Sequence, residues 1–183
     1  FISSHFPSIK IIQNNTNLGY SLGFNKGIDY SISKGADYIL IMNNDTVIDK
    51  SALKELVSVM KKDVSIGFVS GKVLEHDYPT KIQTIGREKD SLNIISDTHI
   101  GSGEIDIGQY DIISECDFVD DVFLLVRKEV INRVGAYDPS FFLYYEETDW
   151  CARVKKSGFK IMLNPFAKIW HKGSLSSGGG MNS

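Results

Sequence analysis

The chain has 183 residues, 42% hydrophobic and 11% aromatic, which is enough apolar surface for the core of one domain and argues against disorder. Its 20 basic and 23 acidic residues give a formal charge of -3, so no basic field for nucleic-acid binding exists and nucleic acid is excluded as a partner. Cys116 and Cys151 form no redox or zinc motif, and no run reaches the roughly 18 apolar residues of a membrane span. We therefore expect a soluble protein of a reducing cytoplasm.

Strand and helix patterns alternate in the first third of the chain. A β-branched run at residues 9–13 predicts a strand, and apolar residues at every fourth position predict a helix over residues 20–33. The uninterrupted apolar run 38–42 is typical of a central parallel strand covered on both faces, and a second helix is predicted over residues 51–62. This alternation indicates an α/β fold.

The rest of the chain continues the alternation around one irregular stretch. From residue 75 to 115 the periodicity is lost and Gly, Asp and Ser are frequent, which predicts an excursion with short strands. The regular elements are predicted as strands at 66–74, 118–126, 160–163 and 167–170 and as helices at 128–134 and 146–157. No interdomain linker is visible, so residues 1–183 are predicted to form a single domain.

Three polar residues, Asn43, Asn44 and Asp45, directly follow the apolar run 38–42. Ligands of open α/β sheets bind beyond the carboxyl ends of the strands, so these side chains stand where a site is expected. An Asx turn or a helix cap is the alternative interpretation of a single Asp in this setting. A binding role therefore needs support from a second polar group.

The pair Glu146 and Glu147 is that second group, and it follows a run of aromatic residues. Acidic residues in a first helical turn also complement the helix dipole, which is the alternative interpretation. Glu147 shares its helical phase with Trp150 and Cys151, whereas Glu146 lies on an adjoining face. A carboxylate packed against aromatic rings is partly desolvated and suited to accept a proton, so the phase favours Glu147 as a general base.

His171 ends the predicted strand 167–170 and precedes Lys172. A lone histidine more often has a structural role. An imidazole and a carboxylate at neighbouring strand ends can nevertheless hold a divalent cation, with diphosphate oxygens completing its coordination shell. His171 and Asp45 are therefore the candidate metal ligands.

These motifs, in this order, resemble the inverting glycosyltransferases of family two with the GT-A fold, particularly the bacterial rhamnosyltransferase-like branch. Residues 17–27 (NLGYSLGFNKG) are similar to a donor-side segment of that family, and residues 43–45 (NND) to its metal motif, usually written DxD. Residues 141–153 (FFLYYEETDWCAR) resemble the segment that holds the base, and residues 169–173 (IWHKG) the family's histidine-glycine element. The similarity covers nearly the whole chain.

The resemblance implies a three-layer GT-A fold with a mixed, mainly parallel central sheet, and inverting transfer of a sugar from a dTDP- or UDP-sugar to a saccharide or lipid-linked saccharide acceptor. It implies Glu147 as the base beside Glu146, and a Mg or Mn ion held by Asp45 and His171. Donor contacts are implied for Asn17, Gly19, Asn25, Asn43, Asn44 and Lys172. The implied setting is bacterial cell-surface polysaccharide synthesis in the cytoplasm, and peripheral association with the inner face of the membrane stays open.

Three features depart from the family pattern. The family's first strands, which hold the nucleotide base, have no counterpart before Phe1, so we expect a fragment that lacks them. Asp120 and Asp121 stand where the family has small residues. We expect these larger, acidic side chains to narrow the acceptor side of the site or to change its charge. Glu147 replaces the usual Asp, which adds one methylene to the base.

Two alternatives to a glycosyltransferase remain at this point. The chain could be a non-catalytic sugar- or nucleotide-binding module, including an inactive truncated relative of the family. A nucleotidyltransferase is the other alternative, but the glycine-rich and basic triphosphate loop that it requires is not visible near the amino terminus. The sequence leaves open the sugar, the acceptor, the preferred metal and the oligomeric state.

Overall fold

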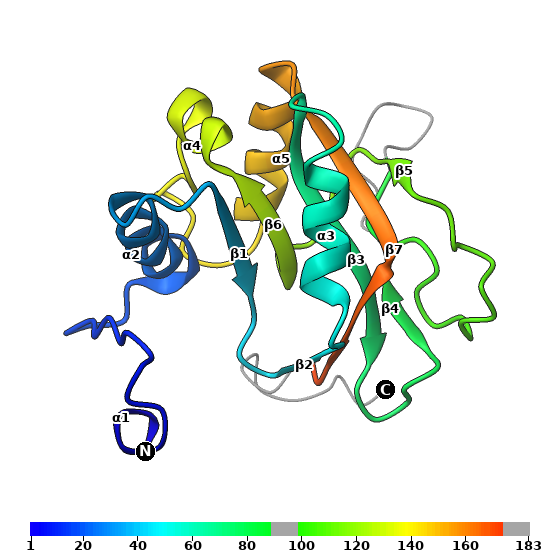
Figure 1. Ribbon diagram of the computed structural model, residues 1–183, viewed down its shortest axis with the longest axis horizontal. Coiled ribbons are helices and arrows are strands. Elements are labelled where there is room, and N and C mark those ends of the chain that lie inside the picture. Colours follow the sequence, from blue (N-terminus) through cyan, green and yellow to red (C-terminus); the bar gives the residue numbers. More distant parts are fainter. Residues whose placement is uncertain (89–98, 174–183) are drawn as a thin grey trace.

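A computed structural model describes residues 1–88 and 99–173 and places one sheet between layers of helices (Figure 1). Within these residues no helix is long and apolar enough to cross a bilayer. The elements follow in the order α1 (Ile2–His5), α2 (Gly19–Ser33), β1 (Tyr38–Met42), β2 (Thr46–Ile48), α3 (Ala52–Met60), β3 (Ile66–Glu75), β4 (Ile82–Thr84), β5 (Ser114–Glu115), β6 (Phe123–Arg127), α4 (Lys128–Val134), α5 (Glu146–Lys156) and β7 (Lys160–His171).

The described strands form one mixed sheet, which confirms the expected α/β architecture. The order is β1-β6-β3-β7-β2, with β4 beside β3 and β5 beside β7. Among the described strands, β3 and β7 form the parallel pair and the other pairings are antiparallel, so the balance is not mainly parallel. β1 is likewise not a central parallel strand, because it ends the described order and pairs antiparallel with β6. An apolar run reports that a strand is covered, and it carries no information on the direction of its neighbours.

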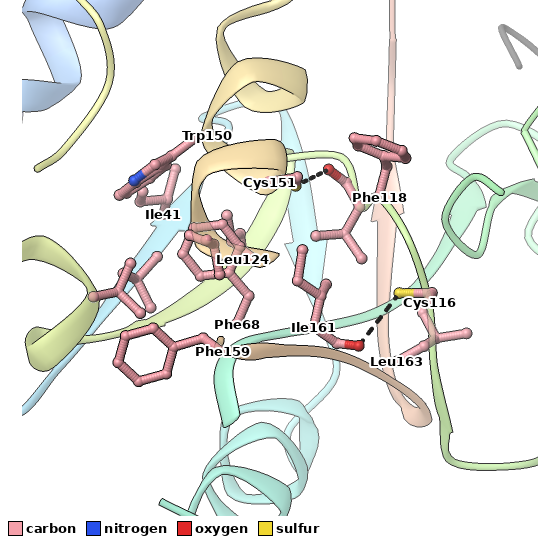
Figure 2. Close-up of a cluster of buried hydrophobic side chains, with 14 of the residues drawn as sticks. Ile41, Phe68, Cys116, Phe118, Leu124, Trp150, Cys151, Phe159, Ile161 and Leu163 are labelled. Carbon is pink, nitrogen blue, oxygen red and sulfur yellow. Dashed lines mark hydrogen bonds between the residues drawn. The ribbon is translucent and has the colours of Figure 1, made fainter. Parts of the chain in front are cut away.

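Helices cover both faces of the sheet (Figure 1), so adjacent residues of one strand enter two different cores. On β3, Phe68 joins the core beneath α5, where its ring centroid lies 4.9 Å from that of Trp150. Val69, the next residue, joins the core beneath α3. Cys116 and Cys151 are free and buried, and Cys151 packs in the first core near Phe68 (Figure 2). Full burial of an apolar side chain such as Phe68 or Val69 contributes about 1.5–3 kcal/mol to the free energy of unfolding.

The two strands predicted after α5 form one long strand, β7, which a bulge interrupts. Gly71 of β3 pairs with Asn164, whereas the next residue, Lys72, pairs with Lys168. The bulged backbone presses on β3, because a Cβ atom at Gly71 would lie 2.2 Å from the carbonyl oxygen of Ala167. A side chain therefore does not fit at this position, and glycine allows the parallel pairing to resume beyond the bulge.

The strand predicted at residues 9–13 is wrong. This segment is irregular, and the side chains of Ile9, Ile11 and Ile12 are 55%, 40% and 39% exposed. A strand satisfies its backbone only against a partner, and no described strand pairs with this segment. In Figure 1 residues 1–17 (dark blue) lie beside the sheet and not within it.

Candidate active site

A pocket of about 570 Å³ opens where the ends of β1, β4 and β7 meet the start of α5 and the loop before β6. One side, here called the strand wall, consists of Asn43, Asp45, Gln83 and His171. The other side, the helix wall, consists of Thr84, Arg87, His99, Asp120, Asp121, Tyr144, Tyr145, Glu146 and Glu147. Five predicted site residues thus come together in one pocket: Asn43, Asp45, Glu146, Glu147 and His171.

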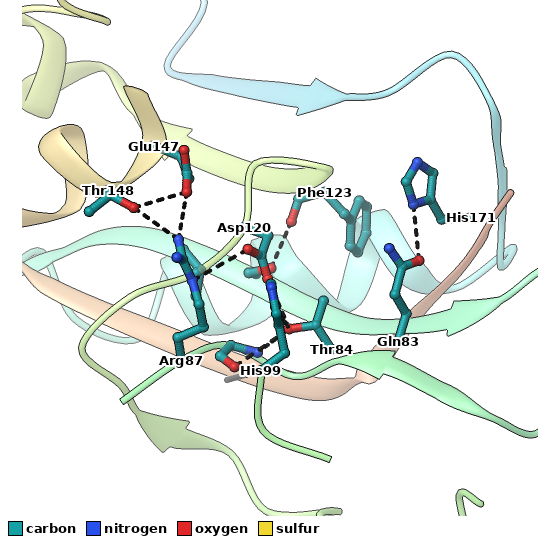
Figure 3. A network of polar contacts seen from close by, with 12 residues as sticks. Gln83, Thr84, Arg87, His99, Asp120, Phe123, Glu147, Thr148 and His171 are labelled. Carbon is teal, nitrogen blue, oxygen red and sulfur yellow. Dashed lines mark hydrogen bonds and ion pairs between the residues drawn. The ribbon is translucent and has the colours of Figure 1, made fainter. Parts of the chain in front are cut away.

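The strand wall is organised by a short antiparallel pairing that the sequence did not predict. β2 pairs with the end of β7, and the backbone N–H of Lys172 donates to the carbonyl oxygen of Asp45 at 3.0 Å. This pairing brings His171 Nε2 to 3.1 Å from Asp45 Oδ1. Asn43 Nδ2 lies 3.4 Å from the same nitrogen, and Gln83 Oε1 lies 3.0 Å from His171 Nδ1 (Figure 3).

The donor chemistry of the strand wall suits a divalent cation. When Gln83 Oε1 accepts the proton of Nδ1, the lone pair of His171 Nε2 faces Asp45, which is how a metal-binding histidine is usually held. The described part of the chain contains no group of three or more His, Cys, Asp or Glu residues placed to hold a metal. Asp45 and His171 therefore offer two ligands, and further ligands have to come from a bound substrate or water.

The helix wall starts with an unusual backbone. Tyr144 and Tyr145 adopt φ angles of 71° and 69°, a left-handed conformation that costs non-glycine residues of the order of 1–3 kcal/mol each. Their rings are exposed, whereas Glu146, the first residue of α5, is only 4% exposed. Burial, and then the nearby charge of Glu147, raises the pKa of Glu146. Glu147 is partly desolvated, as helical phase predicted, with 15% of its side chain exposed. Glu146 is nevertheless the more deeply buried of the two carboxylates, which the phase did not predict.

Glu147 is paired with a buried arginine (Figure 3). Arg87 Nη2 lies 2.6 Å from Glu147 Oε1 and donates to Thr148 Oγ1 at 3.0 Å. The backbone of Arg87 is also held, since its main-chain N–H donates to the carbonyl oxygen of Phe118 at 2.9 Å. Phe118 belongs to the predicted strand 118–126, but regular pairing starts later, at β6.

Asp120 extends the ion-pair network away from α5. Its Oδ1 lies 3.6 Å from Arg87 Nε, and its Oδ2 accepts from Thr84 Oγ1 at 2.8 Å and lies 3.1 Å from His99 Nδ1. Burial opposes ionisation of Asp120, but His99, Arg87 and Thr84 outweigh it and lower its pKa. The hydrogen bond to Asp120 in turn raises the pKa of His99. Burial lowers the pKa of Arg87, yet Asp120 and Glu147 more than offset this and raise it.

Asp121 occupies the floor of the helix wall and behaves differently from Asp120. Burial, and then the charges of Glu147 and Glu146, raises its pKa to about 7. Tyr137 donates its hydroxyl hydrogen bond to Asp121 Oδ2 at 2.7 Å. Two adjacent aspartates therefore differ because Asp120 faces cations, whereas Asp121 faces carboxylates and a phenol.

Five of the predicted donor-binding residues lie outside the pocket lining: Asn17, Gly19, Asn25, Asn44 and Lys172. Asn17 Oδ1 accepts the backbone N–H of Gly19 at 2.9 Å, just before α2. Asn25 exchanges two hydrogen bonds with the backbone of residue 137, at 2.8 and 3.1 Å. Asn44 and Lys172 are exposed. Contact between these residues and a donor stays a prediction.

Four pocket residues were not found from the sequence: Gln83, Thr84, Arg87 and His99. All four lie in the stretch 75–115, where the lost periodicity gave no register to place them. Asp120 and Asp121 were noticed as a departure from a family pattern, without a role. The clearest missed signal is an arginine in a region rich in small residues, because a guanidinium needs an acidic partner when it is buried.

Comparison with solved structures defines the fold. GalNAc-T7, crystallised with UDP, GalNAc and Mn2+, superposes with a TM-score of 0.67 at 13% identity, over 88% of this chain and 32% of that one. A protein of STIV superposes with a TM-score of 0.56 at 12% identity, over 89% of this chain and 71% of that one. The fold is accordingly the GT-A fold of glycosyltransferases.

Sequence comparison identifies the family, since residues 1–135 match Glycosyl transferase family 2. The chain belongs to this family. It is 25% identical to a low-salt glycan biosynthesis hexosyltransferase of Haloferax volcanii over 84% of its length, and 30% identical to a dTDP-rhamnosyl transferase of Shigella flexneri over 85%. The alignments cover 48% and 49% of those two proteins, so the chain spans about half the length of these curated relatives.

Proposed function

We propose that this chain carries the chemical centre of an inverting glycosyltransferase, which moves a sugar from a nucleoside diphosphate to an acceptor hydroxyl in glycan synthesis. The observation that carries this proposal is the pocket itself. It holds a carboxylate, Glu147, that is fixed by a buried cation, together with the acid-imidazole pair Asp45 and His171. A base and a candidate cation site facing one cavity are what a direct displacement of a diphosphate requires.

In this mechanism Glu147 accepts the proton of the acceptor hydroxyl, and the hydroxyl oxygen attacks the anomeric carbon as the nucleoside diphosphate leaves. A single displacement inverts the configuration at that carbon. Asn43, which lines the pocket and accepts from the Tyr20 hydroxyl at 3.4 Å, is placed to orient the donor. Positioning and charge stabilisation supply most of the rate in such a site.

A Mg or Mn ion belongs to the proposal, with Asp45 and His171 as its protein ligands. Bound there, the ion would neutralise the charge of the leaving diphosphate. The orientation of His171 by Gln83 and the small number of protein ligands both fit a cation whose shell is completed by phosphate oxygens. The Mn2+ and UDP in the crystals of GalNAc-T7 support the same choice of donor and cation.

The acceptor side of the proposal rests on the exposed rings at the start of the helix wall. Tyr144 and Tyr145 line the pocket beside Glu146 and Glu147, and 59% and 60% of their surfaces are exposed. Flat, exposed aromatic faces beside the two carboxylates suit a saccharide ring, free or lipid-linked. A dTDP- or UDP-sugar donor is proposed from the relatives' names, and a cytoplasmic location at the inner membrane face from the lipid-linked acceptor.

The test compares Glu147→Gln with Glu146→Gln in the full chain, and uses Glu129→Gln on the exposed start of α4 as the matched control. UDP or dTDP release is measured with UDP-N-acetylglucosamine and dTDP-rhamnose as donor probes and p-nitrophenyl glycosides as acceptor probes. We expect Glu147→Gln to lower turnover by about 10²–10⁴-fold, the usual contribution of a general base, while UDP binding measured by calorimetry with Mn2+ is retained.

Other outcomes reassign the site or the function. Full turnover by Glu147→Gln together with an inactive Glu146→Gln would move the base to Glu146. Tight UDP binding by the wild type without turnover of either donor would favour the alternative function, a non-catalytic nucleotide-binding module. Glu129→Gln is expected to match the wild type in both measurements.

A further inference from the structure

The two oxygens of the Glu147 carboxylate have different surroundings. Oε1 receives two hydrogen bonds, from Arg87 Nη2 at 2.6 Å and from Thr148 Oγ1 at 2.9 Å. Oε2 has no hydrogen-bond partner among residues 1–88 and 99–173. Arg87 and Thr148 also bond to each other at 3.0 Å, so the three groups form a closed triangle on one side of the carboxylate.

Arg87 is itself held rigidly, which makes it suitable as a support. Its side chain is 6% exposed, and its backbone N–H and C=O both bond to Phe118, at 2.9 and 3.1 Å. The preceding residue, Gly86, has a φ of 104°, and a Cβ atom there would lie 3.0 Å from the carbonyl oxygen of Phe118. This turn, which favours glycine, follows β4, and the Arg87 side chain beyond it reaches Glu147 at the start of α5.

The charges around Glu147 explain why a cationic support is needed. Glu146 and Asp121 are buried carboxyls that interact unfavourably with Glu147, and Asp120 lies on the far side of Arg87. Without Arg87, Glu147 would face this acidic cluster with Thr148 alone as a donor. Repulsion would then push its carboxylate towards solvent and away from its present position.

We propose that Arg87 is a positioning residue, which with Thr148 holds Glu147 Oε1 so that Oε2 is left to accept the proton of the acceptor hydroxyl. Arg87 touches neither donor nor acceptor in this role and acts through Glu147. The inference rests on the proposed function, because it requires Glu147 to be the base. It adds that the base is set by a residue 60 positions away in the chain, in the irregular stretch before β5.

The kinetic test uses Arg87→Met, Arg87→Lys and Thr148→Val, with Arg133→Met as the control because Arg133 is exposed and lies outside the pocket. With the donor and acceptor probes named above, Arg87→Met is expected to lower kcat by about 100-fold with both KM values nearly unchanged, as a misplaced catalytic group does. Arg87→Lys retains a cation and should recover part of this loss, and Thr148→Val should lose about fivefold. Arg133→Met should match the wild type.

A double variant separates positioning from an independent contribution. Residues that act as one unit are not additive, so Arg87→Met combined with Glu147→Gln should be no slower than Glu147→Gln alone. Losses that multiply, an Arg87→Met defect confined to KM, or an unchanged kcat would each overturn the inference. If Arg87→Met does not fold, as judged by circular dichroism, Arg87→Lys and Thr148→Val carry the same test.

A crystallographic comparison decides the inference without turnover. In Arg87→Met crystals the Glu147 carboxylate is expected to leave the position that it holds in the wild type, whereas Arg133→Met should leave it in place. A Glu147 carboxylate that keeps its position in Arg87→Met would contradict the inference even if the enzyme is active. Active Glu147→Gln protein would instead refute the proposed function, so the two failures are distinguishable.

Discussion

The two walls of the pocket differ in whether the protein itself supplies a cation for their carboxylates. On the strand wall, Asp45 Oδ1 lies 3.1 Å from His171 Nε2, and the neighbours of His171 are the neutral amides of Gln83 and Asn43. On the helix wall, Arg87 already lies between two carboxylates, 2.6 Å from Glu147 Oε1 and 3.6 Å from Asp120 Oδ1. The strand wall therefore has capacity for a cation from solution, whereas the helix wall has its own.

This difference indicates which wall should respond to metal ions and which wall should respond to pH. A metal ion adds favourable charge where carboxylate and imidazole are paired mainly with each other, and it adds little where an arginine already fills that place. Dependence on pH, by contrast, should come from the helix wall, where burial and like charges raise the pKa of Asp121 and Glu146. Each wall can be altered separately.

The largest of the expected effects is on the strand wall. Asp45→Asn should lower UDP affinity in the presence of Mn2+ by about 100-fold, and Gln83→Leu by about tenfold, because ligands and the partners that orient them each contribute to metal affinity. Calorimetry of UDP with and without Mn2+ measures both, and metal-free binding should be the same in all variants. A Mn2+ response that survives Asp45→Asn, or that is lost in Thr84→Val, would erase the distinction between the walls.

The next effect is a dependence of stability on pH from Asp121. Its pKa is raised to about 7 by burial first and then by Glu147 and Glu146, so the folded state binds this proton more tightly than the unfolded state. The resulting stabilisation is present at acid pH and is lost as the pH rises from about 4 through about 7. Asp121→Asn should remove this loss and raise the unfolding free energy by up to about 4 kcal/mol at alkaline pH.

Thermal unfolding at about pH 6 and about pH 8 measures this effect. The wild type should lose more of its stability between the two values than Asp121→Asn, and Asp37→Asn on the exposed turn before β1 serves as the control. If the stability of all three proteins depended on pH in the same way, Asp121 would not have a raised pKa in the folded state.

The smallest effect probes the far end of the helix-wall network. Thr84→Val keeps the shape of the side chain but removes the hydrogen bond to Asp120 Oδ2 at 2.8 Å, which should destabilise the fold by about 1 kcal/mol. The midpoint of urea unfolding measures this, with Ser58→Ala on the exposed face of α3 as control. An unchanged midpoint would show that His99 and Arg87 alone are sufficient partners for Asp120.

Local pattern predicted most helices and several strands of this fold well. The helices at residues 20–33 and 128–134 correspond to α2 and α4, and the apolar run 38–42 is β1. The wrong or missing predictions concern strands, which form only where a second strand lies beside them. Residues 9–13 have strand composition without a strand beside them, and β2 forms because β7 extends far enough to pair with it.

The candidate site likewise has features that local sequence predicted and features that depend on contacts between distant segments. Residue order and motif indicated Asp45, Glu146, Glu147 and His171, because strand ends and helix starts can be read from local periodicity. The tertiary structure decided which glutamate is buried and which is paired, through the left-handed backbone before α5 and through Arg87. Such contacts join segments 60 or more residues apart, and their partners are chosen by packing and charge, which local sequence does not encode.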